Sequence, residues 1–237
     1  MMSQAAPTRT EHFLTHFNEL EQYLRDSTDS ERNVPFVGLV ELASQHNAAI
    51  RHYGRQMREW SDLRNAVVHE HPKGRIIAEV TPEALEEFQS IVARVTAPPH
   101  VFSLFQRDVR VFKATDLLVE AVEDLWREGY SQVIVRQNTS MTLLSYAGIA
   151  RWMGKAIDGT VIDLGSATVG SALEFEEEGG IGFLARTATI FDARELFHRF
   201  PERRKQRLRV IVITENGKST EAPLGLITAS DIVEAEA

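Results

Sequence analysis

An internal repeat is the sequence feature that most limits what this chain can fold into. The segment "SQVIVRQNTSMTLLSYAGIARWM" from residue 131 aligns with "LRVIVITENGKSTEAPLGLITASDIVEA" from residue 208. Each copy predicts a β-branched strand, a turn, a second strand and a helix. An amphipathic helix precedes each copy, at "TDLLVEAVEDLW" and at "TIFDARELFHRF". Two copies of one unit predict a pseudo-two-fold α/β domain with a crevice between its halves, where small-molecule sites tend to lie.

The first part of the chain has apolar residues at helical spacing instead. We expect four helices: one over 13–24, one over 36–50, one that follows a break at Gly54 and ends before Pro72, and one capped by Thr81. The fold class is therefore α+β multidomain. Its expected parts are a disordered N-terminus at 1–9, a four-helix bundle-like domain at 10–97, a linker at 98–100, and the α/β pair at 101–237, with copies over about 101–158 and 159–237.

Composition excludes several classes of function. The net charge of −8 argues against general binding to nucleic acid or to an anionic membrane, because such binding needs a basic surface. The absence of cysteine excludes disulfides and thiolate metal sites. No apolar stretch is long enough to span a membrane, so a cytoplasmic protein is expected. The acidic segment 174–182, "EFEEEGGIG", is expected to be a solvated loop, and no residue is assigned as a metal ligand or to a required cofactor.

The repeat resembles a pair of CBS (cystathionine β-synthase) domains over roughly residues 101–237. The most specific match is Gly225-Leu226-Ile227-Thr228 followed by Asp231. The resemblance implies a tandem CBS pair, or Bateman module, that dimerises and binds an adenosine nucleotide (AMP, ADP or ATP) as a regulatory ligand. Thr228 would then bind ligand hydroxyl or phosphate oxygens, and Asp231 would accept from the ribose hydroxyls. The alternative is a helix N-cap with a favourable first-turn charge, worth about 1 kcal/mol.

The first copy departs from this pattern, with Ser145 and Gly148 at the threonine and aspartate positions. One strong nucleotide site is therefore expected rather than two. Thr187 lies just before the helix of the second copy, where the family often supplies ligand contacts. Arg207 and Arg209 belong to the cationic cluster 198–209 and would reach phosphates, with a solvated face as the alternative.

The segment "LRNAVVHEHP" at 63–72 raises a second question, because Arg64 lies within the apolar stripe of the third helix. Arg64, Asn65 and His69 match the arginine, polar residue and histidine motif of HEPN domains, which are helical bundles. The resemblance implies a dimeric, metal-independent endoribonuclease that leaves 2′,3′-cyclic phosphate ends. His69 would be the general acid or base, Arg64 would stabilise the phosphorane, and Asn65 would orient the phosphate.

Three interpretations of this motif stay open. Arg64 pairs with a helix carboxylate such as Glu41 or Glu59, or the domain is HEPN-like without catalysis, or it is an active ribonuclease. The chain is thus interpreted as an adenine-nucleotide-sensing regulatory homodimer, in which the CBS pair controls an N-terminal helical effector domain. The alternative is a nucleotide-gated endoribonuclease acting on a specific RNA.

Overall fold

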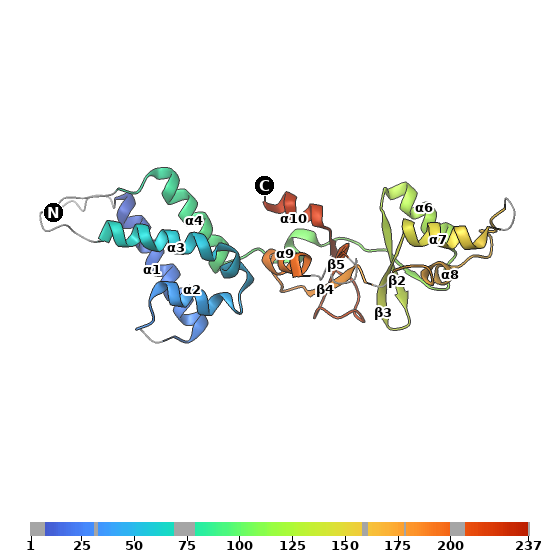
Figure 1. Cartoon of the computed structure of the whole chain (residues 1–237), viewed down its shortest axis with the longest axis horizontal. Coiled ribbons are helices and arrows are strands. Elements are labelled where there is room, and N and C mark those ends of the chain that lie inside the picture. Colours follow the sequence, from blue (N-terminus) through green and yellow to red (C-terminus); the bar gives the residue numbers. More distant parts are fainter. Residues whose placement is uncertain are drawn as a thin grey trace, which may run out of the picture. The chain divides into compact units, whose positions relative to one another are not determined.

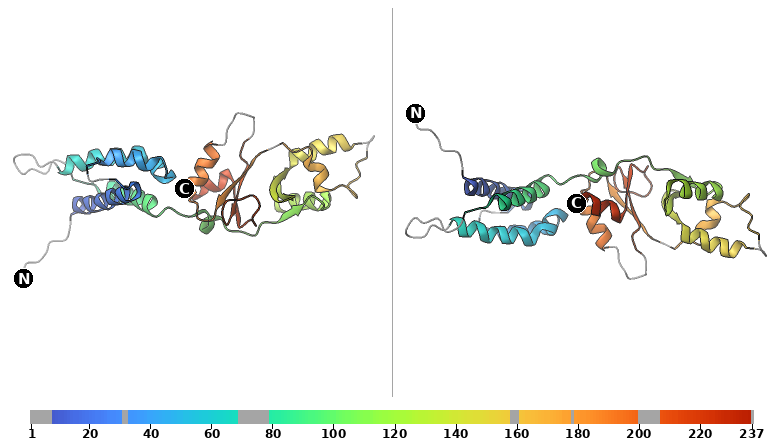
Figure 2. Two further views of the ribbon diagram at one scale, coloured as in Figure 1. Left: turned by 90° about the horizontal axis from the view of Figure 1, so that it is seen from below. Right: turned by 90° about the horizontal axis from the view of Figure 1, so that it is seen from above.

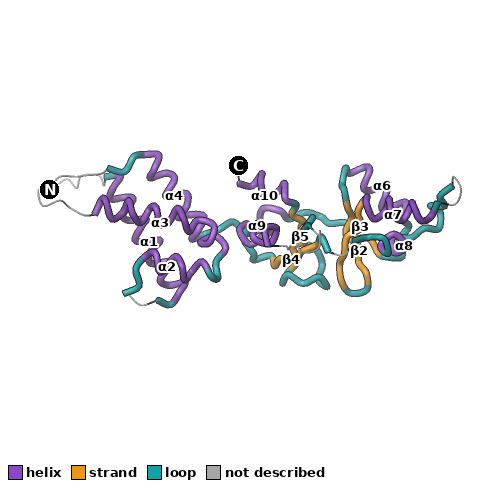
Figure 3. The backbone as a smooth tube through the Cα atoms, viewed as in Figure 1, coloured by secondary structure: helices purple, strands orange, loops and turns teal. Residues whose placement is uncertain are grey.

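The structure, a computed structural model, describes residues 8–30, 33–68, 79–157, 161–177, 179–199 and 207–236. The chain divides into two compact units, Met1–Pro99 and His100–Ala237, and each is described by itself. Within the described residues, all strands lie in the second unit, and the first unit is helical (Figures 1 and 3). No helix in this part of the chain combines the length and the apolar character that crossing a membrane requires.

The first unit contains helices that follow the predicted apolar stripes. They are α1 (Arg9–Thr28), α2 (Phe36–Ser44), α3 (Ala48–Val68) and α4 (Pro82–Thr96). Two threonines fix helix starts: Thr8 forms a capping box with Glu11, and the Thr81 hydroxyl accepts from the Ala84 N–H at 3.2 Å, as predicted for Thr81.

Aromatic side chains form the centre of this unit. Phe13 and Phe17 on α1 are buried, with ring centroids 4.8 Å from Phe88 and 4.5 Å from Phe36, respectively. Trp60 on α3 lies 5.2 Å from Phe88. The rings join α1 to the other three helices, because each ring buries a large apolar area and prefers tilted contacts at these separations.

The predicted break at Gly54 is wrong. Gly54 lies inside α3 and is buried against α2, where an added Cβ would be 3.7 Å from Val40 Cγ1. The chain turns instead at residues 45–47, where the Asn47 side chain accepts from the Ile50 N–H at 3.1 Å. Asparagine at this position satisfies an N–H group that the helix start leaves free.

The second unit contains two three-stranded sheets of the same topology. The first has the order β1 (Val111–Lys113), β2 (Gln132–Gln137), β3 (Ser140–Ser145), and the second has the order β4 (Ile181–Ala185), β5 (Val210–Thr214), β6 (Gly225–Ile227). In both, the first pair is parallel and the second pair is antiparallel. The two predicted strand pairs are confirmed, whereas β1 and β4 were not predicted.

Helices cover one face of each sheet. Those with predicted positions are α6 (Leu118–Glu128), α7 (Tyr146–Ala156), α9 (Ile190–Arg199) and α10 (Ala229–Glu236), and two short ones, α5 (Val101–Phe105) and α8 (Val169–Leu173), were missed. Helices α6, α7 and α8 gather beside the first sheet (Figure 2). Their core includes Val133, Val135 and Leu144, which alternate along the strands with residues that face the other way.

The short helices are exchanged between the two copies. Helix α5 comes before the first sheet in sequence but contacts β6, and the Arg107 N–H that follows it donates to the Leu224 carbonyl at 3.3 Å. Helix α8 comes before the second sheet in sequence but contacts β3 of the first. The predicted boundaries therefore separate the two copies along the sequence. In the folded unit, each sheet is contacted by one short helix from the other copy.

The other faces of the two sheets pack against each other. Ile134, Met141 and Leu143 of the first sheet form one buried cluster with Val210 and Val212 of the second. This cluster holds the two halves together by removing apolar surface from water.

A hairpin of the second copy adds polar contacts to this junction. The Met141 N–H donates to the Ser219 carbonyl at 3.0 Å, and the Arg136 guanidinium donates to the Glu221 carbonyl at 3.1 Å. The Glu221 carboxylate accepts from Asn216 N–H at 2.7 Å, and this bond, with others in the hairpin, lowers the pKa of Glu221 to about 2. The carboxylate thus fixes the loop whose carbonyls bind Arg136.

The α5–β6 contact predicts opposite effects for two glycine-to-alanine substitutions. Gly225→Ala places a Cβ over the Phe105 carbonyl and should lower the free energy of unfolding by about 1–3 kcal/mol. Gly154 is an exposed position of α7 with open space where a Cβ would lie. Gly154→Ala should therefore raise the free energy of unfolding by about 0.5–1 kcal/mol. Urea denaturation of both variants measures the difference, and equal stability of the two would contradict the close α5–β6 approach.

Candidate functional site

Thr228 and Asp231 form a reciprocal cap at the start of α10. The Asp231 Oδ2 atom accepts from the Thr228 N–H at 2.6 Å and from the Thr228 hydroxyl at 2.8 Å. The Asp231 N–H lies 3.4 Å from the same hydroxyl oxygen. The helix N-cap expected in the alternative interpretation is therefore present, and its hydrogen bonds fix the Asp231 carboxylate near the end of β6.

Arg107 reaches the same carboxylate from the segment after α5. Its Nη2 atom donates to the Leu226 carbonyl at 2.6 Å and lies 3.3 Å from Asp231 Oδ2. Among the described residues, no donor reaches the other Asp231 oxygen, Oδ1. The Asp231 side chain thus holds an arginine beside the cap and keeps one oxygen as an acceptor.

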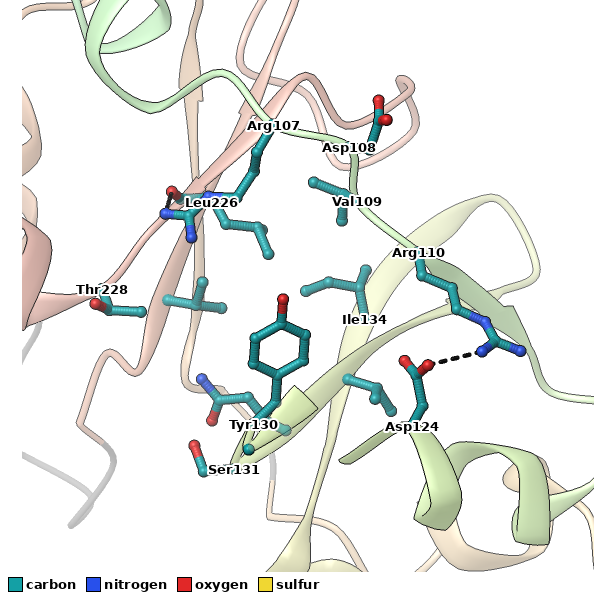
Figure 4. A pocket seen from close by; sticks show the side chains of 14 residues that line it. Arg107, Asp108, Val109, Arg110, Asp124, Tyr130, Ser131, Ile134, Leu226 and Thr228 are labelled. Atoms are coloured by element: carbon teal, nitrogen blue, oxygen red, sulfur yellow. Dashed lines mark hydrogen bonds and ion pairs between the residues drawn. The ribbon is translucent and has the colours of Figure 1, made fainter. Parts of the chain in front are cut away.

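A cavity of about 270 Å³ opens beside this cap, between the two copies. That volume is close to the lower end of the range for small-molecule sites, about 300–1,000 Å³. Its apolar lining comes from strands of both sheets, namely Val133, Ile134, Val210 and Leu226. Tyr130 is 52% exposed, and its hydroxyl points to the middle of the cavity (Figure 4).

The opposite wall includes Arg110 and Asp124, and Asp124, on α6, pairs with two arginines. The Asp124 side chain is only 7% exposed, and its Oδ1 atom accepts from Arg110 and from Arg127, both at 2.7 Å. The Arg110 guanidinium also lies 4.4 Å from the Phe112 ring centroid (Figure 4 shows the Arg110–Asp124 pair). A nearly buried carboxylate needs such partners, since an unpaired charge at this position would be costly.

The cavity has the chemistry of a binding site for a ligand with apolar and anionic parts. Strand side chains supply an apolar floor, and Arg107 and Arg110 supply cations. Asp231 does not line the cavity itself, but its carboxylate contacts two lining residues, Arg107 and Thr228, and can act as a hydroxyl acceptor next to it. Arginine binds phosphate oxygens through several N–H groups at once. Within the described residues, no group of three or more histidine, aspartate or glutamate side chains is placed to hold a metal ion.

Of the predicted ligand residues, Thr228 lines this cavity, Asp231 lies next to it, and Thr187, Arg207 and Arg209 are outside the lining. Thr187 is exposed, its carbonyl accepts from His100 Nδ1 at 2.8 Å, and the cap of α9 is Thr189 instead. Arg207 is exposed and lies outside the cavity lining. Arg209 pairs with Glu176 at 3.3 Å, at the first-copy counterpart of the site. The structure therefore brings Thr228 and Asp231 together, and it separates them from Arg209.

Glu176 corrects the expectation that segment 174–182 is a solvated loop. Its side chain is 6% exposed, and its Oε2 atom accepts from the Ser145 N–H and from the Ser145 hydroxyl, both at 2.7 Å. The neighbouring Glu177 side chain is 55% exposed and pairs with Arg151 at 2.6 Å, as a surface residue does. One carboxylate of the acidic run is thus part of the folded core around α7.

Arg64 lies half-buried at the end of α3, next to exposed Asn65. Its Nη1 atom is 3.4 Å from Asn65 Oδ1, and its guanidinium lies 5.9 Å from the Phe17 ring centroid. The pairing with Glu41 or Glu59, which is one of the three interpretations, is not found among the described residues.

Other arginines take those two carboxylates. Glu41 pairs with Arg58 at 3.7 Å, and Glu59 pairs with Arg55 at 3.6 Å. His69, the remaining residue of the motif, and His71 lie outside the described residues.

Sequence analysis missed the cavity residues Arg107, Tyr130, Arg110 and Asp124. For Asp124 a signal existed, because it falls on the apolar face of α6 with Ala121 and Leu125. A carboxylate at such a position must find a cation. Arg107 had no comparable signal, since it lies outside the two aligned segments that begin at residues 131 and 208, and its partner Asp231 is 124 residues away.

Comparisons with known proteins find similar solved structures only. No protein-family model matches the chain, and no curated protein matches it. A CBS domain-containing protein of unknown function from Kribbella flavida DSM 17836 is 17% identical, with 58% of this chain and 98% of that chain covered and a TM-score of 0.43. A CBS domain-containing protein from Bacillus anthracis str. Ames Ancestor is 18% identical, with coverages of 58% and 91% and a TM-score of 0.40.

CBSX2, crystallised in complex with AMP, is 17% identical, with coverages of 58% and 96% and a TM-score of 0.39. The family that the repeat resembles is therefore also named among the solved structures that match. Because these TM-scores lie below 0.5, the similarity assigns no function to this chain.

The Asp124 network predicts that removing the charge of Asp124 costs much more stability than removing that of Glu120, although both carboxylates contact Arg110. Asp124→Asn should lower the free energy of unfolding by about 1–3 kcal/mol, less than for a fully buried pair because both arginines are more than half exposed. Glu120→Gln removes an exposed partner 3.8 Å from Arg110 and should change the free energy of unfolding by less than about 0.5 kcal/mol. Denaturant titration tests both, and a silent Asp124→Asn variant would contradict the network.

Proposed function

We propose that the chain is an adenine-nucleotide-sensing regulatory protein. In this proposal, the second unit acts as a CBS pair that binds the nucleotide, and the helical first unit is the effector domain that it controls. The supporting observation is the cavity lined by Thr228, which joins an apolar floor and two arginines, with the fixed Asp231 carboxylate next to it behind Arg107 and Thr228. The three parts of a nucleotide require these three kinds of group.

Each part of the ligand has a matching group in the cavity or next to it. The base would lie on Ile134, Val210 and Leu226, with the Tyr130 ring beside it. A ribose hydroxyl would donate to Asp231, whose position is fixed by its bonds to Thr228. The phosphate would bind Arg107, which already lies between the cap and the cavity.

Regulation requires that the nucleotide bind more tightly to one arrangement of the protein than to another. We place this difference in a homodimer, where the ligand changes the geometry of the pair and thereby the exposure of the effector domain. The site lies where the two copies meet, so a ligand there contacts both halves of the second unit. AMP, the ligand of the CBSX2 crystal structure, is the first nucleotide to test.

Nucleotide titration tests the sensor. AMP, ADP or ATP should bind saturably in calorimetry, and Asp231→Ala should weaken binding at least about tenfold, since a charge-assisted hydrogen bond contributes about 1.5–3 kcal/mol. Thr228→Ala should weaken nucleotide binding less, because this variant keeps the Asp231 carboxylate as an acceptor for the ribose hydroxyl.

Asp192→Ala is the matched control. Asp192 caps α9 through two bonds of 2.7 Å to Thr189, which correspond to the bonds of Asp231 to Thr228. Thr189 does not line the cavity, whereas Thr228 does. This variant should lose similar stability, about 1 kcal/mol, and keep its nucleotide affinity. Equal affinity losses in the Asp192→Ala and Asp231→Ala variants would show a general effect on folding, and absence of binding by the wild type would overturn the sensor.

A nucleotide-gated endoribonuclease is the second candidate, and the position of Arg64 favours it. This guanidinium is half-buried, yet among the described residues no carboxylate pairs with it. A cation in that position suits a phosphate group, and Asn65 lies next to it. In this candidate, His69 transfers the proton at the ribose 2′-hydroxyl, and facing motifs of a dimer bind one specific RNA without a metal ion.

Cleavage of RNA separates the two candidates. Arg64→Ala and His69→Ala should each abolish formation of 2′,3′-cyclic phosphate ends while leaving nucleotide affinity unchanged. Arg55→Ala, on the same helix with an exposed side chain, is the control and should cleave normally. A sharp fall in the melting temperature of Arg64→Ala, or cleavage that survives both substitutions, would remove the ribonuclease candidate.

A further inference from the structure

The first-copy site lacks its own carboxylate but contains one from elsewhere in the chain. In the second copy, Asp231 Oδ2 accepts from the N–H and the hydroxyl of Thr228 at 2.6 and 2.8 Å. In the first copy, Glu176 Oε2 accepts from the N–H and the hydroxyl of Ser145, both at 2.7 Å. The same two donors are thus satisfied by the same chemical group in both copies.

Gly148 makes this substitution sterically possible. It is three residues after Ser145, as Asp231 is three residues after Thr228. A Cβ at residue 148 would overlap Glu176 Oε2 and lie 3.1 Å from Glu176 Cδ. The space of the missing aspartate side chain is therefore filled by the glutamate, and the two residues exclude each other.

An arginine completes the correspondence. Arg209 Nη1 lies 3.3 Å from Glu176 Oε1, as Arg107 Nη2 lies 3.3 Å from Asp231 Oδ2. The two sites differ in accessibility, since the side chain of Glu176 is 6% exposed and that of Asp231 is 24% exposed. A carboxylate so far removed from water is held only by donors that match it.

We propose that Glu176 is an internal ligand that occupies the first-copy site and closes it to external anions. The donors of Ser145 and Arg209 form a carboxylate-binding site, and the chain supplies the carboxylate itself. In combination with the proposed nucleotide sensor, on which this part rests, Glu176 determines the stoichiometry: one nucleotide per chain instead of two.

Chemical rescue tests the internal ligand without any nucleotide. Glu176→Ala should lower the melting temperature of the full chain by several degrees, and millimolar acetate should restore it saturably by replacing the lost carboxylate. Acetamide, the neutral isostere, should not restore it, and acetate should leave the wild type unchanged. Glu177→Ala, the exposed neighbour, should show neither the loss nor the rescue. Equal responses of Glu176→Ala to acetate and acetamide would overturn the proposal.

A swap variant tests the closing of the site. Gly148→Asp alone should lower the melting temperature, because its carboxylate meets that of Glu176, and the double variant Gly148→Asp/Glu176→Ala should recover it. Calorimetry should then give two nucleotides per chain in the double variant and one in the wild type. A stoichiometry that stays at one would overturn the closing role. If the wild type binds no nucleotide, the proposed sensor fails, and the acetate rescue alone decides whether Glu176 is an internal ligand.

Discussion

The packing of the two sheets against each other is the interaction on which the rest of the second unit depends. Side chains alternate along each strand, so Val133 and Val135 face the helices while Ile134 faces the other sheet. Each three-stranded sheet is too small to bury both of its faces alone. The cavity continues this junction, since its floor includes Ile134, Val210 and Leu226 from the same cluster. A single copy would have neither the buried cluster between the sheets nor the cavity.

The exchange of α5 and α8 gives the two copies of the site different chemistry. Each short helix crosses to the sheet of the other copy and leads the chain past the end of that sheet's last strand. After α5 the chain places Arg107 against the Asp231 carboxylate, and after α8 it places Glu176 at the Ser145 cap. A cation completes one site and an anion fills the other. The pseudo-symmetry of the fold is therefore compatible with one open site and one occupied site.

Sequence reasoning could predict what depends on near neighbours. The buried stripe of α1, the Thr81 cap and the paired strands β2–β3 and β5–β6 are set by residues a few positions apart. It missed β1, which has three residues and forms by parallel pairing with β2 about twenty positions later. It misplaced the break at Gly54, because packing of α3 against Val40 outweighs the weak helix propensity of glycine. Within the site, Thr228 and Asp231 followed from a local motif, whereas Arg107 depends on a contact across 124 residues.

Arg107 lies close in sequence to the point where the chain enters the second unit. His100 is the first residue of the second unit, and α5 follows it at once. The same short stretch is bonded to the second copy at two places, through the His100 bond to the Thr187 carbonyl and through the Arg107 bond to the Leu226 carbonyl. A force on the Arg107 side chain therefore acts within a few residues of the point where the chain arrives from the helical unit. The chain thus enters the second unit through a short segment that ends at Arg107, a residue of the cavity lining.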